Sequence, residues 1–519
     1  MASFFLKAQE ITDSTTVELL PEEKWWAGVV REGHLMPFEP NEEYSIDLMG
    51  NNEGNQIQPL LLSDKGRIIW SESPIKFTIG ESEISVASYG SPIDVKRSSK
   101  DSNLKEAFQF ASSEYFPASG KIPDTLLFTK PQYNTWIELI YNQNQEDILE
   151  YAQNIIKNGF PPGVLMIDDN WQEDYGKWQF HEGRFEDPKE MVDSLHQMGF
   201  KVMLWVCPFV SPDSDVYRNL EDKKYLIQEA TGDNNPLIVR WWNGASGVLD
   251  FTNPGAVSWY EEQLDRLVDT YGIDGFKFDA GDSYFYDQPL KSFKDVSPNE
   301  HTLTFQKFGL KYPLNEYRAS WKMGGQPLAQ RLHDKGHNWD DLQMLIPQML
   351  LQGLIGYPFN APDMIGGGEF GSFINLEAVD QELIVRSAQV HALMPMMQFS
   401  VAPWRVLDEK HFEAVQKSVE LRKQYLPLIM DLVHQASENG EPIVRPMEYE
   451  FPGEGYYNIK DQFMLGSDIL VAPILQRGVS SRTVILPKGR WTWKDKIYKG
   501  GKNIEIEVAL NELPVFERK

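Results

Sequence analysis

The sequence predicts an α/β protein in which a (β/α)8 barrel of the TIM type is flanked by an N-terminal β-sandwich and a small C-terminal β-sandwich. Strand-like runs separated by turn residues fill positions 1–130, and strand and helix patterns alternate over 131–438. Strand-like runs return over 439–519, and at 519 residues the chain is too long for one hydrophobic core. These three regions are the predicted domains.

The N-terminal region has the rhythm of an antiparallel sandwich. Its β-forming runs are TTVELL, YSIDLM, IQPLLL, GRIIW, IKFTIG and ISVASYG, separated by turn residues such as Asn-Asn-Glu-Gly. One helical pattern, residues 102–113, interrupts them.

The central region alternates between the two periodicities of an α/β barrel. Strands are predicted at 135–140, 163–169, 201–209, 275–279, 317–321, 330–334, 358–363 and 396–403. Helices are predicted at 145–158, 188–198, 256–271, 339–354 and 376–393. A doubly wound sheet would instead show a Gly-rich phosphate turn after an early strand, and the sequence has none, so the barrel is favoured.

Composition excludes several classes of function. The net charge of -27, without clustered Lys and Arg, argues against partners such as nucleic acid or an anionic membrane. Cys207 is the only cysteine, so no intramolecular disulfide and no zinc site of the Cys-pair type is expected. No apolar run reaches the ~18 residues of a membrane helix. The first 13 residues lack the basic and apolar segments of a secretory leader, so a cytoplasmic location is expected unless a leader was removed from a periplasmic or secreted protein.

One predicted strand, residues 275–279, carries charge where buried strands are usually apolar. Lys277 and Asp279 lie two residues apart and therefore point to the same side of the strand. A cation within reach would keep Asp279 ionised at neutral pH and available as a nucleophile. A structural ion pair under a loop accounts for these residues equally well, so the surrounding sequence has to decide.

Aspartates follow several predicted strands, at the end of a barrel where active sites lie. Asp168, Asp279, Asp334 and Asp363 end the second, fourth, sixth and seventh strands. Such carboxylates can bind a hard metal ion, hold sugar hydroxyls, or act as an acid and nucleophile pair. The neighbouring tryptophans favour sugar, since a pyranose face stacks on an aromatic ring; they are Trp171, Trp205, Trp241 and Trp242. Other aspartates, Asp282, Asp340 and Asp341, have the positions of helix caps or first-turn charges.

Seven sequence blocks in order resemble glycoside hydrolase family 31. They are IDDNW, the segment from FEDPKE to WVCPF, RWWNG with LDFTNPGAVSWY, DGFKFDAGD, residues 318–339, the segment from IPQMLL to DMIGG, and EPIVRPMEYEFP with QFMLGSDILVAPIL. The resemblance implies a retaining, exo-acting α-glycosidase. It implies Asp279 as nucleophile and Asp334 as acid/base, although the family usually has Trp-x-Gly-Asp-Asn where this chain has Arg331-Leu-His-Asp-Lys335.

The resemblance also implies a substrate site and no cofactor or metal. Asp168 matches the aspartate that binds the non-reducing-end hydroxyls, Trp242 a wall of the sugar subsite, and Arg318 the arginine beside the acid/base. The full expected substrate-binding set is Asp168, Asp169, Trp171, Trp205, Trp242, Lys277, Arg318 and Asp363. The expected partner is a glycoside or oligosaccharide, and the oligomeric state stays open.

The chain is most similar to the branch of the family associated with α-galactosidase activity. Asp169 stands where glucose-specific members usually have an aromatic residue, and a carboxylate leaves room for, and accepts hydrogen bonds from, an axial O4. The alternatives are an α-glucosidase, an α-xylosidase or an α-N-acetylgalactosaminidase on the same fold. A metal-dependent hydrolase and a non-catalytic carbohydrate-binding protein are more remote.

Overall fold

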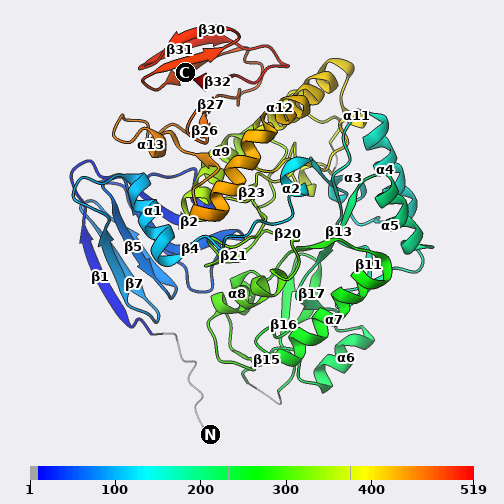
Figure 1. The fold of residues 1–519 in the computed structure, drawn as a ribbon. Coiled ribbons are helices and arrows are strands. Elements are labelled where there is room, and N and C mark those ends of the chain that lie inside the picture. The colour runs from blue at the N-terminus through cyan, green and yellow to red at the C-terminus, as the bar shows by residue number, and fades with distance from the viewer. Residues whose placement is uncertain (1–9, 232–233, 375) are drawn as a thin grey trace.

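Eight parallel strands form the barrel in the computed structural model, which describes residues 10–231, 234–374 and 376–519 (Figure 1). Adjacent barrel strands pair in parallel, and a bridge between Met364 and Gln398 brings the two outer strands together into a nearly closed barrel. In chain order the strands are β9 (Gln132–Asn134), β10 (Val164–Ile167), β13 (Lys201–Val206), β18 (Gly275–Phe278), β20 (Leu314–Tyr317), β22 (Gln330–Arg331), β23 (Asn360–Ala361) and β24 (Gln398–Phe399). The predicted fold class is confirmed.

Two of the predicted barrel strands are wrong in position. The first strand is β9, and the segment predicted as strand, 135–140, instead contains the short helix α3 (Trp136–Leu139). The fifth strand is β20, whereas the later part of the predicted segment forms β21 (Ser320–Trp321), which pairs with an N-terminal strand.

Polar side chains inside the barrel explain both errors. Gln132 and Glu316, from the two misplaced strands, are buried, and Gln398 joins them. Its Nε2 donates to Glu316 Oε2 at 2.7 Å and to Gln132 Oε1 at 3.1 Å. Because these buried polar side chains bond to one another across the barrel, their strands lack the apolar alternation that is used to find strands in sequence.

Helices surround the barrel, and the five predicted ones are present. They are α4 (Gln145–Lys157), α5 (Pro188–Gln197), α7 (Pro254–Tyr271), α9 (Trp339–Leu354) and α10 (Gln381–Ala392), to which the structure adds α6 (Asp215–Asp222), α8 (Pro298–Gly309), α11 (Pro403–Val406) and the long α12 (Glu409–Asn439). β20 and β22 are joined through β21 without a helix, so one of the connections departs from the regular βα alternation.

Local sequence sets where the helices leading to the site begin and end. Before β18, the Asn253 side chain caps α7, Pro254 occupies its first turn, and Gly272 ends it in the left-handed conformation at φ 82°. Asp340 and Asp341 lie in the first turn of α9, as predicted. Helix α7 therefore delivers the chain into β18 at a defined residue.

Further strands project from the barrel between its regular units. They are the hairpin β11 (Gln172–Asp174) and β12 (Lys177–Phe180), the small sheet of β14 (Phe209–Val210), β16 (Ile238–Trp241) and β17 (Gly244–Val248), and the pair β15 (Gln228–Glu229) and β19 (Leu290–Lys291). Short helical turns complete these connections: η2 (Ser283–Tyr286) and η3 (Phe370–Ser372).

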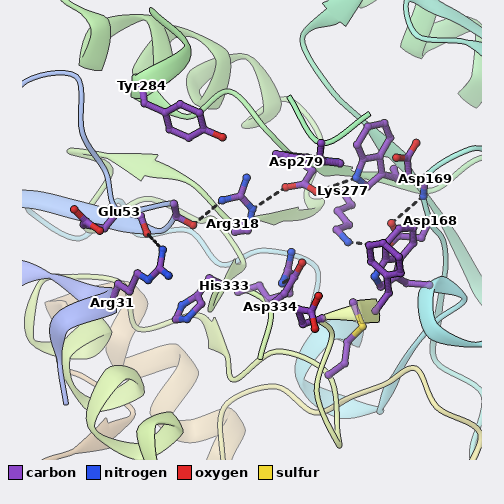
Figure 2. Close-up of a pocket in the computed structure, with 18 of the residues that line it drawn as sticks. Arg31, Glu53, Asp168, Asp169, Lys277, Asp279, Tyr284, Arg318, His333 and Asp334 are labelled. Atoms are coloured by element: carbon purple, nitrogen blue, oxygen red, sulfur yellow. Dashed lines mark hydrogen bonds and ion pairs between the residues drawn. The ribbon is translucent and has the colours of Figure 1, made fainter. Parts of the chain in front are cut away.

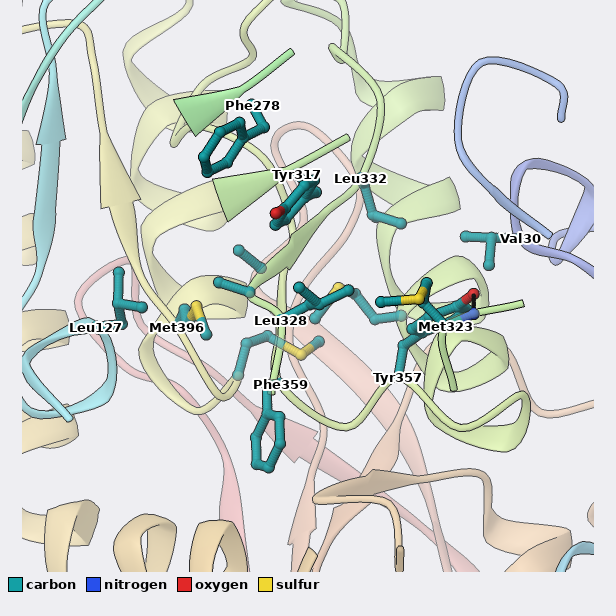
Figure 3. Close-up of a cluster of buried hydrophobic side chains, with 14 of the residues drawn as sticks. Val30, Leu127, Phe278, Tyr317, Met323, Leu328, Leu332, Tyr357, Phe359 and Met396 are labelled. Atoms are coloured by element: carbon teal, nitrogen blue, oxygen red, sulfur yellow. Dashed lines mark hydrogen bonds between the residues drawn. The ribbon is translucent and has the colours of Figure 1, made fainter. Parts of the chain in front are cut away.

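The N-terminal domain consists of two antiparallel sheets beside the barrel, at the left of Figure 1. One contains β1 (Asp13–Glu18), β3 (Tyr44–Asp47), β6 (Ile75–Ile79) and β7 (Glu83–Ser88); the other contains β2 (Trp25–Val29), β4 (Gln56–Ser63), β5 (Arg67–Ser71) and β8 (Ile93–Arg97). Each of the six predicted runs contains a strand, and the predicted helix is α1 (Leu104–Tyr115). One hydrophobic cluster runs from this domain into the barrel and includes Val30, Phe278 and Tyr317 (Figure 3).

The C-terminal β domain lies at the end of α12, at the top of Figure 1. Its main sheet contains β25 (Val444–Arg445), β26 (Phe463–Leu465), β27 (Ile469–Val471), β29 (Arg490–Trp493), β30 (Lys496–Lys499) and β32 (Val515–Arg518), and β28 (Ser481–Leu486) pairs with β31 (Lys502–Glu507). The boundaries at 130/131 and 438/439 stay predictions. In the described ranges no helix has the length and apolar character needed to cross a membrane, and residues 1–9, on which most of the leader prediction rests, lie outside those ranges.

Candidate active site

A cavity of about 610 Å³ opens where the barrel strands end (Figure 2). The barrel contributes most of its walls, and the N-terminal domain contributes four residues. The lining residues are Arg31, Asn51, Glu53, Gly54, Trp136, Tyr141, Asp168, Asp169, Trp205, Trp242, Lys277, Asp279, Tyr284, Arg318, Arg331, His333, Asp334, Met364, Glu369 and Phe370. The cavity therefore brings together eight of the ten residues that the sequence singled out.

Asp279 follows β18, and both of its carboxylate oxygens accept side-chain hydrogen bonds. Its Oδ2 accepts a hydrogen bond from Trp205 Nε1 at 3.0 Å, and its Oδ1 accepts one from Arg318 Nε at 3.0 Å. Burial by itself raises the pKa of this carboxyl, but the charges of Arg318, Lys277 and Arg331 outweigh it, so the pKa lies well below its usual range. Asp279 is thus ionised and fixed in orientation.

Lys277 pairs with a different carboxylate from the one expected. Its Nζ lies 2.7 Å from Asp168 Oδ2, and both side chains are about 95% buried. Burial lowers the pKa of Lys277, but the neighbouring Asp168 reverses this effect and the net shift is upward. The cation in contact with Asp279 is therefore Arg318, while Lys277 acts on it through space.

Asp169 is a buried carboxylate with no cation in contact. Its Oδ2 accepts hydrogen bonds from Asn243 Nδ2 and, at 3.3 Å, from the Tyr175 hydroxyl. Burial and the adjacent charge of Asp168 raise its pKa to about 7. Asp169 therefore changes its charge near neutral pH, whereas Asp279 does not.

Arg318 links the barrel to the N-terminal domain. Two of its nitrogens donate to the two oxygens of Asp282 at 3.0 and 2.7 Å, and Nη1 also donates to the carbonyl oxygen of Gly54 at 2.6 Å. Asp282 is the N-cap residue of η2, as predicted from its position, but it makes no side-chain capping bond, because its carboxylate binds Arg318. Arg318 therefore contacts both Asp279 and the loop before β4, which contains Gly54.

Asp334 is the most exposed of the aspartates in the cavity. About 44% of its side chain is accessible, and its Oδ1 accepts a hydrogen bond from Arg331 Nη1. The same Nη1 donates to Asp363 Oδ1 at 3.0 Å. Asp334 thus lies at the cavity while its Oδ1 is bound to the buried Arg331 guanidinium, which also binds Asp363.

Two of the predicted substrate-binding residues lie behind the cavity wall. Trp171 is fully buried, packs near Trp178 and Phe180, and donates from Nε1 to the Trp205 carbonyl oxygen at 2.8 Å. Asp363 is also fully buried. Their expected contact with sugar is therefore corrected, because neither side chain has a surface that a ligand in the cavity can touch.

Trp242 is placed as predicted, on the cavity wall. Its side chain is 48% exposed, and the Arg318 guanidinium carbon lies 5.5 Å from the centroid of its ring. Tyr284, 49% exposed, also lines the cavity. Exposed aromatic rings at a polar cavity are suited to stacking on a sugar face.

Sequence reasoning missed the contributions of Arg31, Glu53 and Tyr284. Figure 2 shows Arg31 and Glu53 on the side of the cavity opposite Asp168 and Asp169. Glu53 lies in an irregular polar loop, and Arg31 and Tyr284 lie in 3-10 helices of three and four residues, so periodicity carries no information about them. The one available signal was the turn at residues 51–54, Asn-Asn-Glu-Gly, which was recognised only as a break between strands.

Three carboxylates of the cavity form ion pairs with cations of the protein itself. Asp168, Asp279 and Asp334 each contact a Lys or Arg nitrogen. Among residues 10–231, 234–374 and 376–519, no three His, Cys, Asp or Glu side chains gather as a metal site would require.

Comparisons with known proteins agree with this geometry. The TIM-barrel domain of glycosyl hydrolases family 31 matches residues 128–432, and the C-terminal domain of the same family matches 440–519. The chain belongs to glycoside hydrolase family 31.

Particular relatives fall within this family. The chain is 33% identical over 425 residues to the myogenesis-regulating glycosidase of Mus musculus, covering 80% of this chain and 58% of that protein. It is 28% identical to alpha-glucosidase 2 of Bacillus thermoamyloliquefaciens, covering 80% and 59%, so it spans about three fifths of the length of these relatives. A solved Flavobacterium johnsoniae GH31 dextranase, at 21% identity, superposes with a TM-score of 0.85 over 99% of this chain and 68% of that one, which shows the shared fold.

Proposed function

We propose that the protein is a retaining, exo-acting α-glycosidase that hydrolyses terminal α-galactosides, with Asp279 as nucleophile and Asp334 as acid/base. The observation that carries the proposal is the state of Asp279: a buried carboxylate with a lowered pKa, held by Arg318 and Trp205 at a cavity of sugar size. Asp334 lines the same cavity and has the exposure that a proton donor to a leaving group needs.

The reaction is a double displacement. In the first step an oxygen of Asp279 attacks the anomeric carbon, the bond to the leaving oxygen breaks, and protonated Asp334 gives its proton to that oxygen. In the second step Asp334 removes a proton from water, the water oxygen attacks the anomeric carbon, and Asp279 departs as a carboxylate. Two inversions leave the α configuration unchanged.

The residues around Asp279 are suited to a carboxylate that loses its charge in the first step and regains it in the second. Trp205 and Arg318 aim one carboxylate oxygen each, which leaves no freedom for the group to rotate away from the sugar. When the glycosyl bond forms, the carboxylate loses its charge, and Arg318 remains balanced by Asp282. The Asp168 and Lys277 pair offers a charged acceptor and donor to hydroxyls at the non-reducing end.

The preference for galactose rests on Asp169. An aspartate is smaller than an aromatic residue. Its Oδ1 accepts only a long hydrogen bond, from Gln172 Nε2 at 3.5 Å, and has capacity to accept one from an axial O4. Replacing Asp169 by Tyr should therefore weaken galactoside hydrolysis by 10²-fold or more, because bulk replaces a hydrogen-bond acceptor. An unchanged rate would remove the argument for galactose.

A second candidate is an α-glucosidase or an α-xylosidase acting through the same two carboxylates. The names of two relatives favour it: alpha-glucosidase 2, and the alpha-xylosidase XylQ of Lactiplantibacillus pentosus, which is 27% identical over 422 residues. This candidate changes the sugar and keeps the mechanism.

The test is a panel of p-nitrophenyl α-glycosides of galactose, glucose, xylose and N-acetylgalactosamine. We expect the galactoside to react fastest and Asp279→Asn to abolish its hydrolysis. Another preferred sugar, still dependent on Asp279, would discard the galactose proposal and keep the mechanism. Undiminished hydrolysis by Asp279→Asn would discard the mechanism, and loss of activity in a chelator, reversed by Mg²⁺ or Mn²⁺, would favour a metal-dependent hydrolase instead.

A further inference from the structure

Arg331 stands among three carboxylates beneath the cavity. Its Nη1 donates to both Asp334 and Asp363, and its Nε lies 3.3 Å from Glu316 Oε1. The Arg331 side chain is 1% exposed, and those of Glu316 and Asp363 are 2% and 0% exposed. One guanidinium charge therefore serves three carboxyl groups, of which Glu316 and Asp363 are buried from water.

Asp363 fastens both ends of the turn that carries Asp334. Its Oδ1 accepts from Arg331, before Asp334 in sequence, and its Oδ2 accepts from the Lys335 backbone N–H, directly after it, at 2.8 Å. The Asp363 backbone has a φ of 81°, in the left-handed region, which is strained for a residue other than glycine. Gly368 lies so close that an added Cβ would be 2.8 Å from Asp363 Oδ1. Asp363 is held tightly in a strained position, as functional positions often are.

Of the three carboxylates around Arg331, which are Glu316, Asp334 and Asp363, only Asp334 lines the cavity. Its side chain is 44% exposed, and the two other carboxylates around Arg331 are buried. A change of charge at Arg331 or Asp363 therefore acts on Asp334 at short range, through the Nη1 that Asp334 and Asp363 share.

We propose that Arg331 and Asp363 are positioning residues for Asp334: Arg331 holds its carboxylate by a charged hydrogen bond, and Asp363 fastens the residues on either side of it. This inference rests on the proposed function, in which Asp334 is an acid in one step and a base in the next. The guanidinium of Arg331 and the carboxyl group of Asp363 meet at the same Nη1 that binds Asp334, so their charges act on Asp334 in opposite senses. Arg331 stands where the family usually has a tryptophan.

The pKa of Asp363 responds to both Arg331 and Asp334. Burial raises it, Arg331 lowers it, the charge of Asp334 raises it again, and the result is about 7. The other charged groups that act on Asp334 are Arg318 and Lys335. The remaining titratable groups of the cavity are Arg31, Glu53, Tyr141, Asp168, Asp169, Lys277, Asp279, Tyr284, His333 and Glu369.

The test is the pH profile of kcat/KM on the preferred p-nitrophenyl glycoside, for wild type, Arg331→Met and Asp363→Asn. Its alkaline limb reports loss of the proton from the general acid. Removing the cation should move this limb to higher pH by about one unit, and removing the buried anion should move it to lower pH by about the same amount. Shifts in opposite directions are not expected from two variants that merely loosen the fold.

Two further variants separate positioning from stability. Arg331→Lys keeps the charge and loses the two-way hydrogen bond, so we expect a fall of about tenfold in kcat with the limb almost unmoved. Arg445 is a buried arginine of the C-terminal domain that pairs with Glu441 and Glu450, away from the cavity. Arg445→Met is the matched control, and its profile should coincide with that of wild type even if its stability falls.

The outcomes are distinct. Limbs that stay within 0.2 pH units of wild type in both Arg331→Met and Asp363→Asn, or that move in the same direction, overturn the inference. Should Arg331→Met fail to fold, Asp363→Asn and Arg331→Lys decide by the same criteria. A wild-type protein that hydrolyses no glycoside, or a fully active Asp334→Asn variant, overturns the proposed function instead.

Discussion

The ends of β10 and β18 present two buried carboxylates that behave in opposite ways. Asp279, after β18, has a pKa well below the usual range, whereas the pKa of Asp169, just beyond β10, is raised to about 7. Burial acts on both in the same direction, so it does not explain the difference. The contacts do: Asp279 touches Arg318 and Trp205, while Asp169 touches neutral groups and lies beside Asp168. The barrel supplies similar positions, and neighbouring charges decide which carboxylate stays ionised.

The largest effect is expected from Asp279→Asn. The amide keeps the shape of the carboxylate but has no nucleophilic charge, so kcat should fall by about 10⁴-fold or more. Steady-state rates on the preferred aryl glycoside measure this loss. Asp169→Asn is the matched comparison at the other strand, and its loss should be at least 10²-fold smaller; equal losses would break the distinction between the two sites.

Removing the cation beside Asp279 should have the next largest effect. Arg318→Met leaves a buried carboxylate without its strongest neighbour, which raises the pKa of Asp279, and we expect kcat/KM to fall by about 10²- to 10³-fold. The acid limb of the pH profile should move to higher pH, because Asp279 then gains a proton more easily. Arg318→Lys, which retains a charge, should lose less, and an unmoved acid limb in Arg318→Met would show that Arg318 does not control the ionisation of Asp279.

A smaller effect is expected from the indole that donates to Asp279. Trp205→Phe removes one hydrogen bond at 3.0 Å and retains most of the packing, so a loss of about tenfold in kcat is expected. Trp171→Phe is the control, because the Trp171 indole donates to a backbone carbonyl behind the cavity wall. If both variants lose activity equally, orientation of Asp279 by Trp205 is not the cause.

The smallest effect concerns stability at the Asp169 site. A carboxyl whose pKa is raised on folding, from its ordinary value to about 7, binds its proton more tightly in the folded protein. The unfolded chain therefore holds fewer protons between about pH 4 and 7, and stability falls as the pH rises through this window. Between pH 5 and 8, the fall in Tm measured by thermal unfolding should be about 2 °C smaller in Asp169→Asn than in wild type. A wild-type Tm that rises with pH over this range, with Asp169→Asn unchanged, would contradict the raised pKa.

The same contrast explains which parts of the barrel and the site could be predicted from the sequence: strand patterns could, and contacts with neighbouring side chains could not. β18 was predicted correctly because its apolar residues and turn signals are strong, and Asp279 could be singled out at its end. β9 and β20 were misplaced because their inward side chains, such as Gln132 and Glu316, are polar. The pairing of Asp279 with Arg318 rather than Lys277 depends on a residue 39 positions away, which strand spacing does not reveal.

The N-terminal contribution to the cavity was also beyond the sequence. Gly54 and Glu53 come from a loop whose residues show no periodicity, and they reach the cavity because Arg318 binds the Gly54 carbonyl oxygen. Contacts of this kind are set by the docking of two domains. Local propensity says nothing about such docking.

The most direct test of the account is the identity of the residue that becomes bonded to the sugar. A 5-fluoro-α-galactosyl fluoride, or the analogue of whichever sugar the panel prefers, should slow the second step and allow the glycosyl-enzyme to accumulate. Peptide mapping by mass spectrometry of the trapped protein should then place the sugar on Asp279. Label on another carboxylate, or rapid turnover by an enzyme that forms no adduct and inverts the product, would contradict the account.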